Sequence, residues 1–143
     1  MKEDGIFFGE ADYWDLTGDG KEEAILTLSI QTGGSAIPEL IYIYTLQNSK
    51  PKMLWGFMTG DRAEGGLKEV YAENGELVVE LFGVDKFENN EWKFNLPKEG
   101  AGGLCCPTVF TKFRFKWNGR NFALIGKPEL FDYDWKKEVT KNQ

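Results

Sequence analysis

The chain has 143 residues, of which 41% are hydrophobic and 15% aromatic, and its formal net charge is −6. This length suits one domain with its own core, and the acidic balance argues against nucleic acid as a partner, because phosphate binding draws on a concentrated basic surface. The chain contains no histidine. A Ser-His or Cys-His catalytic triad is therefore excluded, and a typical catalytic zinc site is disfavoured.

Membrane insertion is not indicated by the sequence. No apolar run reaches the roughly 18 residues that a membrane helix requires, and about the first 30 residues lack the basic-then-apolar pattern of a leader. We therefore expect no membrane span in this chain. The high aromatic share favours strands and large flat packing surfaces.

The first distinctive segment is residues 15–23, DLTGDGKEE, which leads directly into the apolar residues 24–30. Oxygen-bearing groups alternate along it, and Gly20 stands where a cation-binding loop must turn sharply. In loop order, the candidate calcium ligands are the side chain of Asp15, the side chain of Thr17, the side chain of Asp19, the backbone carbonyl of Lys21 and the side chain of Glu23. A helical EF-hand would also need a glutamate at the twelfth position, where this chain has Leu26.

This segment resembles the shorter D-x-D-x-D-G-x-x-D loops of integrin-type FG-GAP and VCBS repeats, which lie between β-strands and bind calcium in many members. The resemblance implies Ca²⁺ as a cofactor, although Thr17 places a neutral hydroxyl where the pattern has a carboxylate. The alternative is a structural β-turn, in which the aspartates accept hydrogen bonds from backbone amides and Gly18 and Gly20 adopt positive φ. The sequence favours the turn and keeps calcium binding as the second interpretation.

Short alternating runs separated by turn residues follow along the chain. The pairs are residues 40–46 with 52–57, 67–72 with 76–82, and 111–117 with 121–125. Asn74-Gly75 and Asn118-Gly119 separate the last two pairs and are typical of type I′ hairpin turns. The pattern predicts an all-β fold, an antiparallel meander of about seven to ten strands that forms a barrel-like structure or a two-sheet sandwich with minimal helix. We expect a single β-domain over residues 1–143, with a core over about 6–135 and a polar tail over 136–143.

The run 111–117 shows the cleanest alternation. One face carries Phe113, Phe115 and Trp117, and the other carries Lys112, Arg114 and Lys116. We expect the aromatic face to point to the core and the basic face to be solvated and paired with acidic neighbours.

Cys105 and Cys106 are adjacent and precede Pro107, at the end of a long segment that breaks the strand rhythm. Adjacent cysteines do not match C-x-x-C spacing, which disfavours a zinc or thioredoxin-type site. Because the chain has no third cysteine, a long-range intrachain disulfide is excluded. Three states remain open: free thiols, a strained vicinal disulfide, or a disulfide to another chain.

The order of several motifs gives a resemblance over about residues 10–126. The motifs are DLTGDGKEEA, TGGSA, TGDR, NGELVVE, CCPT and FRFKWNG. In this order the chain resembles a group of small exported bacterial proteins that are described as hypothetical secreted proteins or lipoproteins. The resemblance implies a periplasmic, secreted or lipid-anchored location with the leader removed, while a cytoplasmic location stays open, and it implies no activity.

We expect a non-enzymatic exported β-domain that binds a protein or a cell-envelope polymer, with calcium as a brace. One alternative is an inhibitor of a lytic enzyme that acts through a projecting loop over residues 100–107. Another is a small glycoside hydrolase that uses clustered carboxylates. Its candidates are Asp12, Asp15, Asp19, Glu22 and Glu23. Exposed tyrosines or tryptophans gathered on one surface would favour the binding function.

Overall fold

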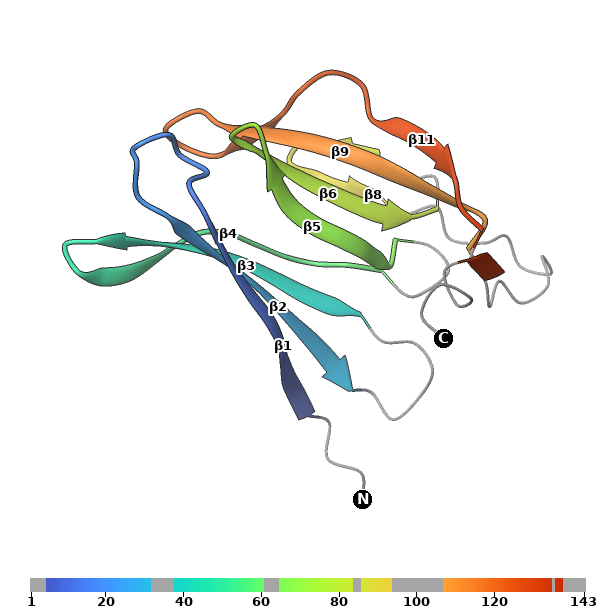
Figure 1. Cartoon of the computed structure of the whole chain (residues 1–143), viewed down its shortest axis with the longest axis horizontal. Helices are drawn as coiled ribbons and strands as arrows, with labels where there is room; N and C mark the ends of the chain where they lie inside the picture. Colours follow the sequence, from blue (N-terminus) through green and yellow to red (C-terminus); the bar gives the residue numbers. More distant parts are fainter. Residues whose placement is uncertain are drawn as a thin grey trace.

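The computed structural model describes residues 5–31, 38–60, 65–83, 86–93, 107–134 and 136–137. The described residues form eleven strands, arranged as two antiparallel sheets and a separate hairpin, and no helix is among their elements. The predicted all-β class is therefore confirmed. Of the two predicted arrangements the sandwich is correct, because neither sheet closes on itself among the described strands (Figure 1).

The first sheet consists of four strands that follow one another in the chain. They are β1 (Gly5–Trp14), β2 (Glu23–Gln31), β3 (Glu39–Gln47) and β4 (Lys50–Met58). Each strand pairs with the next, so β1 and β4 are the edges of this sheet. A β-bulge interrupts β1 between Phe8 and Glu10. Gly9 lies in this bulge, and a Cβ atom there would come within 2.6 Å of the Thr27 carbonyl oxygen.

The second sheet contains five strands, two of them short. They are β5 (Leu67–Glu73), β6 (Glu76–Phe82), β9 (Val109–Trp117), β10 (Phe122–Leu124) and β11 (Glu129–Asp132). The order is β10-β9-β6-β5, and β11 pairs with the other end of β9. Figure 1 shows β5, β6, β9 and β11 of this sheet. Between β6 and β9 the chain forms the hairpin of β7 (Lys86–Glu88) and β8 (Glu91–Lys93). With these two short strands the described strands number eleven, just above the predicted seven to ten.

Three hairpins end in the tight turns that asparagine favours, among them β7–β8, where Asn89 and Asn90 have φ of 54° and 62°. Asn74 and Gly75 have φ of 54° and 76°, as the predicted type I′ turn requires. The β3–β4 turn also has two positive φ values, 54° at Asn48 and 65° at Ser49. Here β3 extends to Gln47 and β4 starts at Lys50, so the connection is shorter than the sequence pattern indicates.

The β9–β10 hairpin forms where the sequence predicts it, but its turn differs from the predicted type I′ turn. Gly119 has a φ of 93°, whereas Asn118 is not among the positive-φ residues. The Oδ1 atom of Asn118 accepts hydrogen bonds from the amides of Arg120 and Asn121, both at 2.9 Å. This side chain therefore stabilises a longer loop between Trp117 and Phe122.

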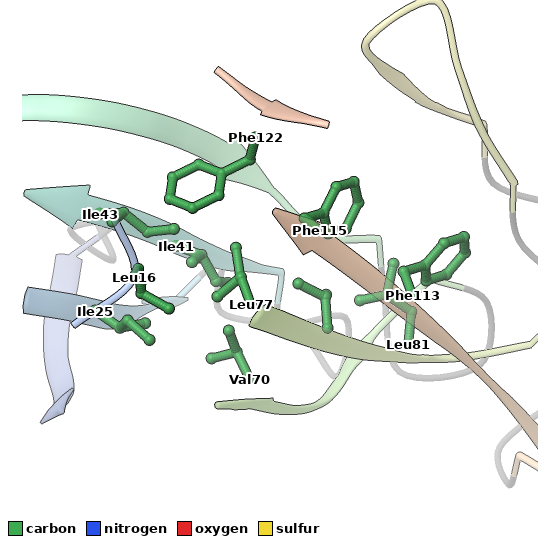
Figure 2. Close-up of a cluster of buried hydrophobic side chains, with 11 residues drawn as sticks. Leu16, Ile25, Ile41, Ile43, Val70, Leu77, Leu81, Phe113, Phe115 and Phe122 are labelled. Atoms are coloured by element: carbon green, nitrogen blue, oxygen red, sulfur yellow. The ribbon is translucent and has the colours of Figure 1, made fainter. Parts of the chain in front are cut away.

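The two sheets meet over one apolar core, shown in Figure 2. The first sheet contributes Ile25, Ile41 and Ile43, each at most 1% exposed. The second sheet contributes Val70, Leu77, Val79, Leu81, Phe113, Phe115 and Phe122. Period-two alternation places these residues on the inner faces.

The β7–β8 hairpin extends the core with aromatic side chains. The Trp92 ring lies edge-on to the Phe113 ring at a centroid distance of 4.9 Å and stacks on Trp55 at 6.3 Å. Phe87 meets Phe115 edge-on at 5.0 Å. The stacked contact with β4 and the edge-to-face contacts with β9 fix the hairpin against both sheets.

Two of the three basic side chains of β9, Lys112 and Arg114, lie on the outer face of the second sheet and are paired as predicted, whereas Lys116 is exposed and has no ion pair among the described residues. Lys112 lies 3.6 Å from Glu80, and Arg114 lies within 3.5–3.9 Å of three exposed or half-buried glutamates. Glu80 is only 4% exposed and also binds Lys68 Nζ at 2.9 Å and the Tyr71 hydroxyl. This buried carboxylate therefore joins β5, β6 and β9 through charged hydrogen bonds.

Several opposing effects act on the pKa of Glu80. Burial raises it, but the hydrogen bonds from Tyr71 and Lys68 and the charges of Lys68 and Lys112 outweigh burial, so the pKa lies below its ordinary value of 4.5. The same contacts act in the opposite sense on Tyr71: burial first, and then the Glu80 carboxylate, raise the pKa of its hydroxyl. The ionised form of Glu80 is thus favoured in the folded state.

We predict that Glu80→Gln destabilises the protein in a pH-dependent way. A folded-state pKa below the unfolded value contributes stability that is present above the unfolded pKa and is lost as pH falls through the folded pKa. The difference in unfolding free energy between wild type and variant should therefore be largest near pH 7 and shrink below about pH 4, measured by urea unfolding. Glu88→Gln is the control, because Glu88 is exposed in β7 and has no ion pair with any residue that the structure describes. An equal offset for Glu80→Gln at both pH values would contradict the prediction.

Candidate functional site

The loop that joins β1 to β2 is held by its own aspartates. Asp15 accepts hydrogen bonds from the amides of Gly18 at 2.8 Å and Gly20 at 2.9 Å, one to each carboxylate oxygen. Asp19 accepts from the amide of Lys21 at 2.8 Å. Gly18 and Gly20 have φ near +80°, a conformation that glycine adopts without strain. The loop is therefore a turn held by aspartate side chains, as the structural-turn interpretation predicts.

Glu23 fixes this turn to the core. It is 0% exposed, and its Oε1 accepts hydrogen bonds from the amides of Leu16 at 2.8 Å and Thr17 at 3.1 Å. Its Oε2 accepts a hydrogen bond from the hydroxyl of Thr45 in β3, at 3.0 Å. A buried carboxylate is tolerated when such donors replace its hydration. The loop, β2 and β3 are thereby linked through one side chain.

The predicted calcium ligands are partly brought together. Oxygen atoms of Asp15, Asp19 and Glu23 all lie within 4.8 Å of one another. The hydroxyl oxygen of Thr17 is buried and has no hydrogen-bond partner in the described part of the chain, and Thr17 is not in this group. Lys21 contributes its amide to the turn. The turn interpretation accounts for the loop's hydrogen bonds, whereas the calcium interpretation rests on the grouping of three carboxylates.

Two other predicted features lie outside the described residues. Cys105 and Cys106 are not described, and neither is most of the loop 100–107, of which only Pro107 is. The thiol state and the projecting inhibitory loop therefore stay predictions. Most of the polar tail 136–143 also lies beyond the described residues.

The five carboxylates expected for a glycoside hydrolase lie in three separate parts of the structure. Asp15, Asp19 and Glu23 belong to the turn, whereas Glu22 lines a groove on the outer face of the first sheet. Asp12 lines a separate cleft between the sheets. The structure thus does not bring these five side chains into one site.

The outer face of the first sheet, defined as the side turned away from the second sheet, is apolar. One row across all four strands consists of Tyr13, Ala24, Tyr44 and Met53. Tyr13 and Met53 are 61% and 51% exposed, and Leu46 at the end of β3 is 65% exposed. Several of these residues line a groove of about 580 Å³, in which Glu22 is the charged member of the lining.

The next row of the outer face is shaped by a glycine. Tyr42 pairs with Gly56 across β3 and β4, and a Cβ atom at Gly56 would lie 2.8 Å from the Tyr42 ring. The absence of a side chain at Gly56 thus lets the ring lie across β4. The ring centroids of Tyr42 and Tyr44 are 6.3 Å apart. The two rings, tilted by 52° to each other, form an aromatic surface beside the groove.

The sequence contained a signal for this surface. Ile41 and Ile43 of β3 are buried inward, yet Leu40, Tyr42 and Tyr44 between them are also apolar. A sheet with one solvated face alternates apolar and polar residues, whereas a strand that is apolar at both parities is typical of a sheet covered on both sides. The run 40–46 therefore indicated that another surface covers the outer face of this sheet.

Comparison with known proteins gives no further guide, because no family model, curated protein or solved structure matches this chain. Among the described residues, no helix is long and apolar enough to cross a membrane.

We predict that Glu23→Ala lowers the unfolding free energy by about 2–4 kcal/mol, because it leaves buried amide donors without an acceptor. Urea unfolding would measure the loss. The matched control is Glu22→Ala, next to it in the chain but exposed, for which we expect a change of at most about 0.5 kcal/mol. Equal effects of the two substitutions would show that the buried hydrogen bonds do not hold the loop.

Proposed function

We propose that this protein is a non-enzymatic binding module that holds a protein partner on the outer face of its first sheet. The supporting observation is the row of Tyr13, Tyr44 and Met53 beside the apolar groove, with Tyr13 and Met53 more than half exposed. Isolated exposed apolar residues are ordinary, but a contiguous apolar patch marks an interaction surface. Of the two tyrosines in this row Tyr13 is exposed and Tyr44 is half-buried, so the expected cluster of aromatic side chains is one exposed ring and one half-buried ring beside the exposed Met53 and Leu46.

The composition of the face favours a protein over a cell-envelope polysaccharide. Aromatic residues and methionine are enriched in the centres of protein interfaces, where charged residues are depleted. Leu46, Met53 and Pro51 offer aliphatic surface with no hydrogen-bonding side-chain group. A sugar polymer would need several polar groups around the aromatic rings to satisfy its hydroxyls, and the lining supplies the Glu22 carboxylate and the hydroxyls of two tyrosines, since the hydroxyl of Thr45 already donates to Glu23.

The face is tested by selecting peptides from a random displayed library on the wild-type protein. We expect the selected peptides to be apolar and aromatic, and to lose at least about tenfold in affinity for the double variant Tyr13→Ser with Leu46→Ser, since truncation of a central contact costs more than about 1 kcal/mol. Both side chains are exposed, so the variant should melt at close to the wild-type temperature.

The matched control is Ile125→Ser with Leu130→Ser, which removes two exposed apolar side chains near the second sheet. The proposal is overturned if peptides bind both variants alike. It is also overturned if the wild type retains insoluble polysaccharide and selects no peptide.

Calcium binding by the loop over residues 15–23 is a second candidate function, favoured by the grouping of Asp15, Asp19 and Glu23. An exported location, which we propose from the sequence resemblance, would suit such a site, because extracellular modules bind calcium with millimolar affinity. The site would then stabilise the β1–β2 connection.

For this candidate, we predict that about 5 mM calcium stabilises the chelator-treated protein by about 1 kcal/mol, the gain that mass action gives for a millimolar site. A thermal melt with magnesium as control measures it. The gain should vanish in Asp15→Asn with Asp19→Asn, in which the single amide oxygen of each side chain still accepts one backbone hydrogen bond, while position 15 loses one of its two. A melt that calcium leaves unchanged would reduce the loop to a structural turn.

A further inference from the structure

A cleft of about 530 Å³ opens between the inner face of β1 and β2 and the edge strand β5. It lies on the opposite side of the first sheet from the outer face. Its lining includes Glu10, Asp12 and Trp14 of β1, Glu39 of β3, and Lys68 and Glu69 of β5. The cleft is thus built from strands that are far apart in the sequence.

The cleft carries uncompensated negative charge. Its carboxylates are Glu10, Asp12, Glu39 and Glu69. Within the described part of the chain, none of these four side chains has an ion pair or a hydrogen bond. Lys68, the basic member of the lining, is already engaged: its Nζ lies 2.9 Å from Glu80 and 4.4 Å from the centre of the Phe110 ring.

The carboxyl group of Glu39 is affected by the negative charge of the cleft. It is half-buried, and burial, together with the nearby charge of Glu10, raises the pKa of its carboxyl group. A raised pKa means that the ionised form lacks a compensating positive charge. A bound cation would supply that charge, whereas a neutral sugar would leave the repulsion unchanged.

The shape of the site favours an organic cation over a metal ion. Among the described residues, the carboxylates that gather within 4.8 Å of one another are those of the β1–β2 loop, and the four cleft carboxylates form no such group. A compact divalent ion needs its oxygens around one point. An extended molecule with spaced ammonium groups can meet separated carboxylates one at a time.

Trp14 adds an aromatic contact to the cleft. Its side chain is 46% exposed and belongs to the same lining as Glu10 and Asp12, the preceding alternate residues of β1. An ammonium group over an indole ring is stabilised by the ring's negative face. Carboxylates and an exposed indole in one concavity are the combination that recognises an alkylammonium ion.

We propose that this cleft binds an organic polycation through its ammonium groups, which contact the carboxylates of Glu10, Asp12 and Glu39 and the ring of Trp14. The ammonium groups can belong to a free polyamine or to lysine side chains of a peptide. This proposal does not depend on the binding function proposed for the outer face, because the cleft and the groove share no lining residue and are tested with different variants.

Isothermal titration calorimetry at low salt, with spermidine as the probe, tests the site. We expect each of Glu10→Gln and Glu39→Gln to weaken binding about fivefold, the effect of one charge pair in a solvated setting, and the double variant to weaken it more strongly. Trp14→Leu should also weaken binding. The charge-matched control, Glu88→Gln with Asp132→Asn, removes two exposed carboxylates outside the cleft and should bind as the wild type does.

Lower pH should release the probe, since a protonated carboxyl group no longer attracts an ammonium group. The titratable groups that line the cleft together with Glu39 are Glu10 and Asp12 on β1 and Lys68, Glu69 and Tyr71 on β5, while β2 contributes the non-titrating Thr27 and Ser29. Because the pKa of Glu39 is raised, its part of the affinity should be lost at higher pH than for an ordinary glutamate.

A capped tetralysine peptide, titrated in parallel, separates the two sources of ammonium groups. Tighter binding of spermidine assigns a free polyamine, tighter binding of the peptide assigns a protein's lysines, and either supports the site. The proposal is overturned if neither probe binds at millimolar concentration or if the control double variant weakens binding as much as the cleft double variant does. It is also overturned if magnesium displaces the probe at equal concentration while Trp14→Leu has no effect.

Discussion

The rest of the structure depends on the contact between the inner faces of the two sheets. Ile41 and Ile43 from one sheet and Phe113 and Phe115 from the other are fully buried there. Because side chains alternate along a strand, the burial of one set fixes the direction of every other side chain in the same strand. In β3 this places Tyr42 and its neighbours on the outer face, and in β1 it turns acidic residues toward the second sheet. Both candidate surfaces are thus consequences of one packing choice.

Much of the fold could be predicted from local sequence patterns. The alternation in 111–117 correctly placed Phe113 inward and Lys112 outward, because period two is a property of the strand itself. Asn74-Gly75 correctly marked a tight turn. The pairing of β6 with β9 was beyond such reasoning, since it joins strands separated by the β7–β8 hairpin and depends on packing of the whole core. The β9–β10 turn differed because side-chain hydrogen bonds of Asn118 outweighed the Asn-Gly preference.

The candidate sites also divide into features that local sequence predicts and features that depend on strands distant in the sequence. The turn over residues 15–23 is local, so its spacing alone pointed to the aspartates that accept its amide hydrogen bonds. The role of Thr45 as a partner of Glu23 requires β3 to lie beside β2, which no local pattern contains. The acidic cleft combines β1, β3 and β5, and its charges look like ordinary surface residues until the strands are placed together.

The bulge at Gly9 has a consequence for the molecule's behaviour in concentrated solution. β1 is an edge strand of ten residues, and such a strand offers unpaired backbone groups to the edge of another copy. The bulge breaks the regular ladder, and Glu10 and Asp12 would lie beside the like charges of a second copy across the new strand pair. The same carboxylates that give the cleft its charge therefore also disfavour the pairing of β1 with an edge strand of another copy, and so disfavour fibre-like assembly.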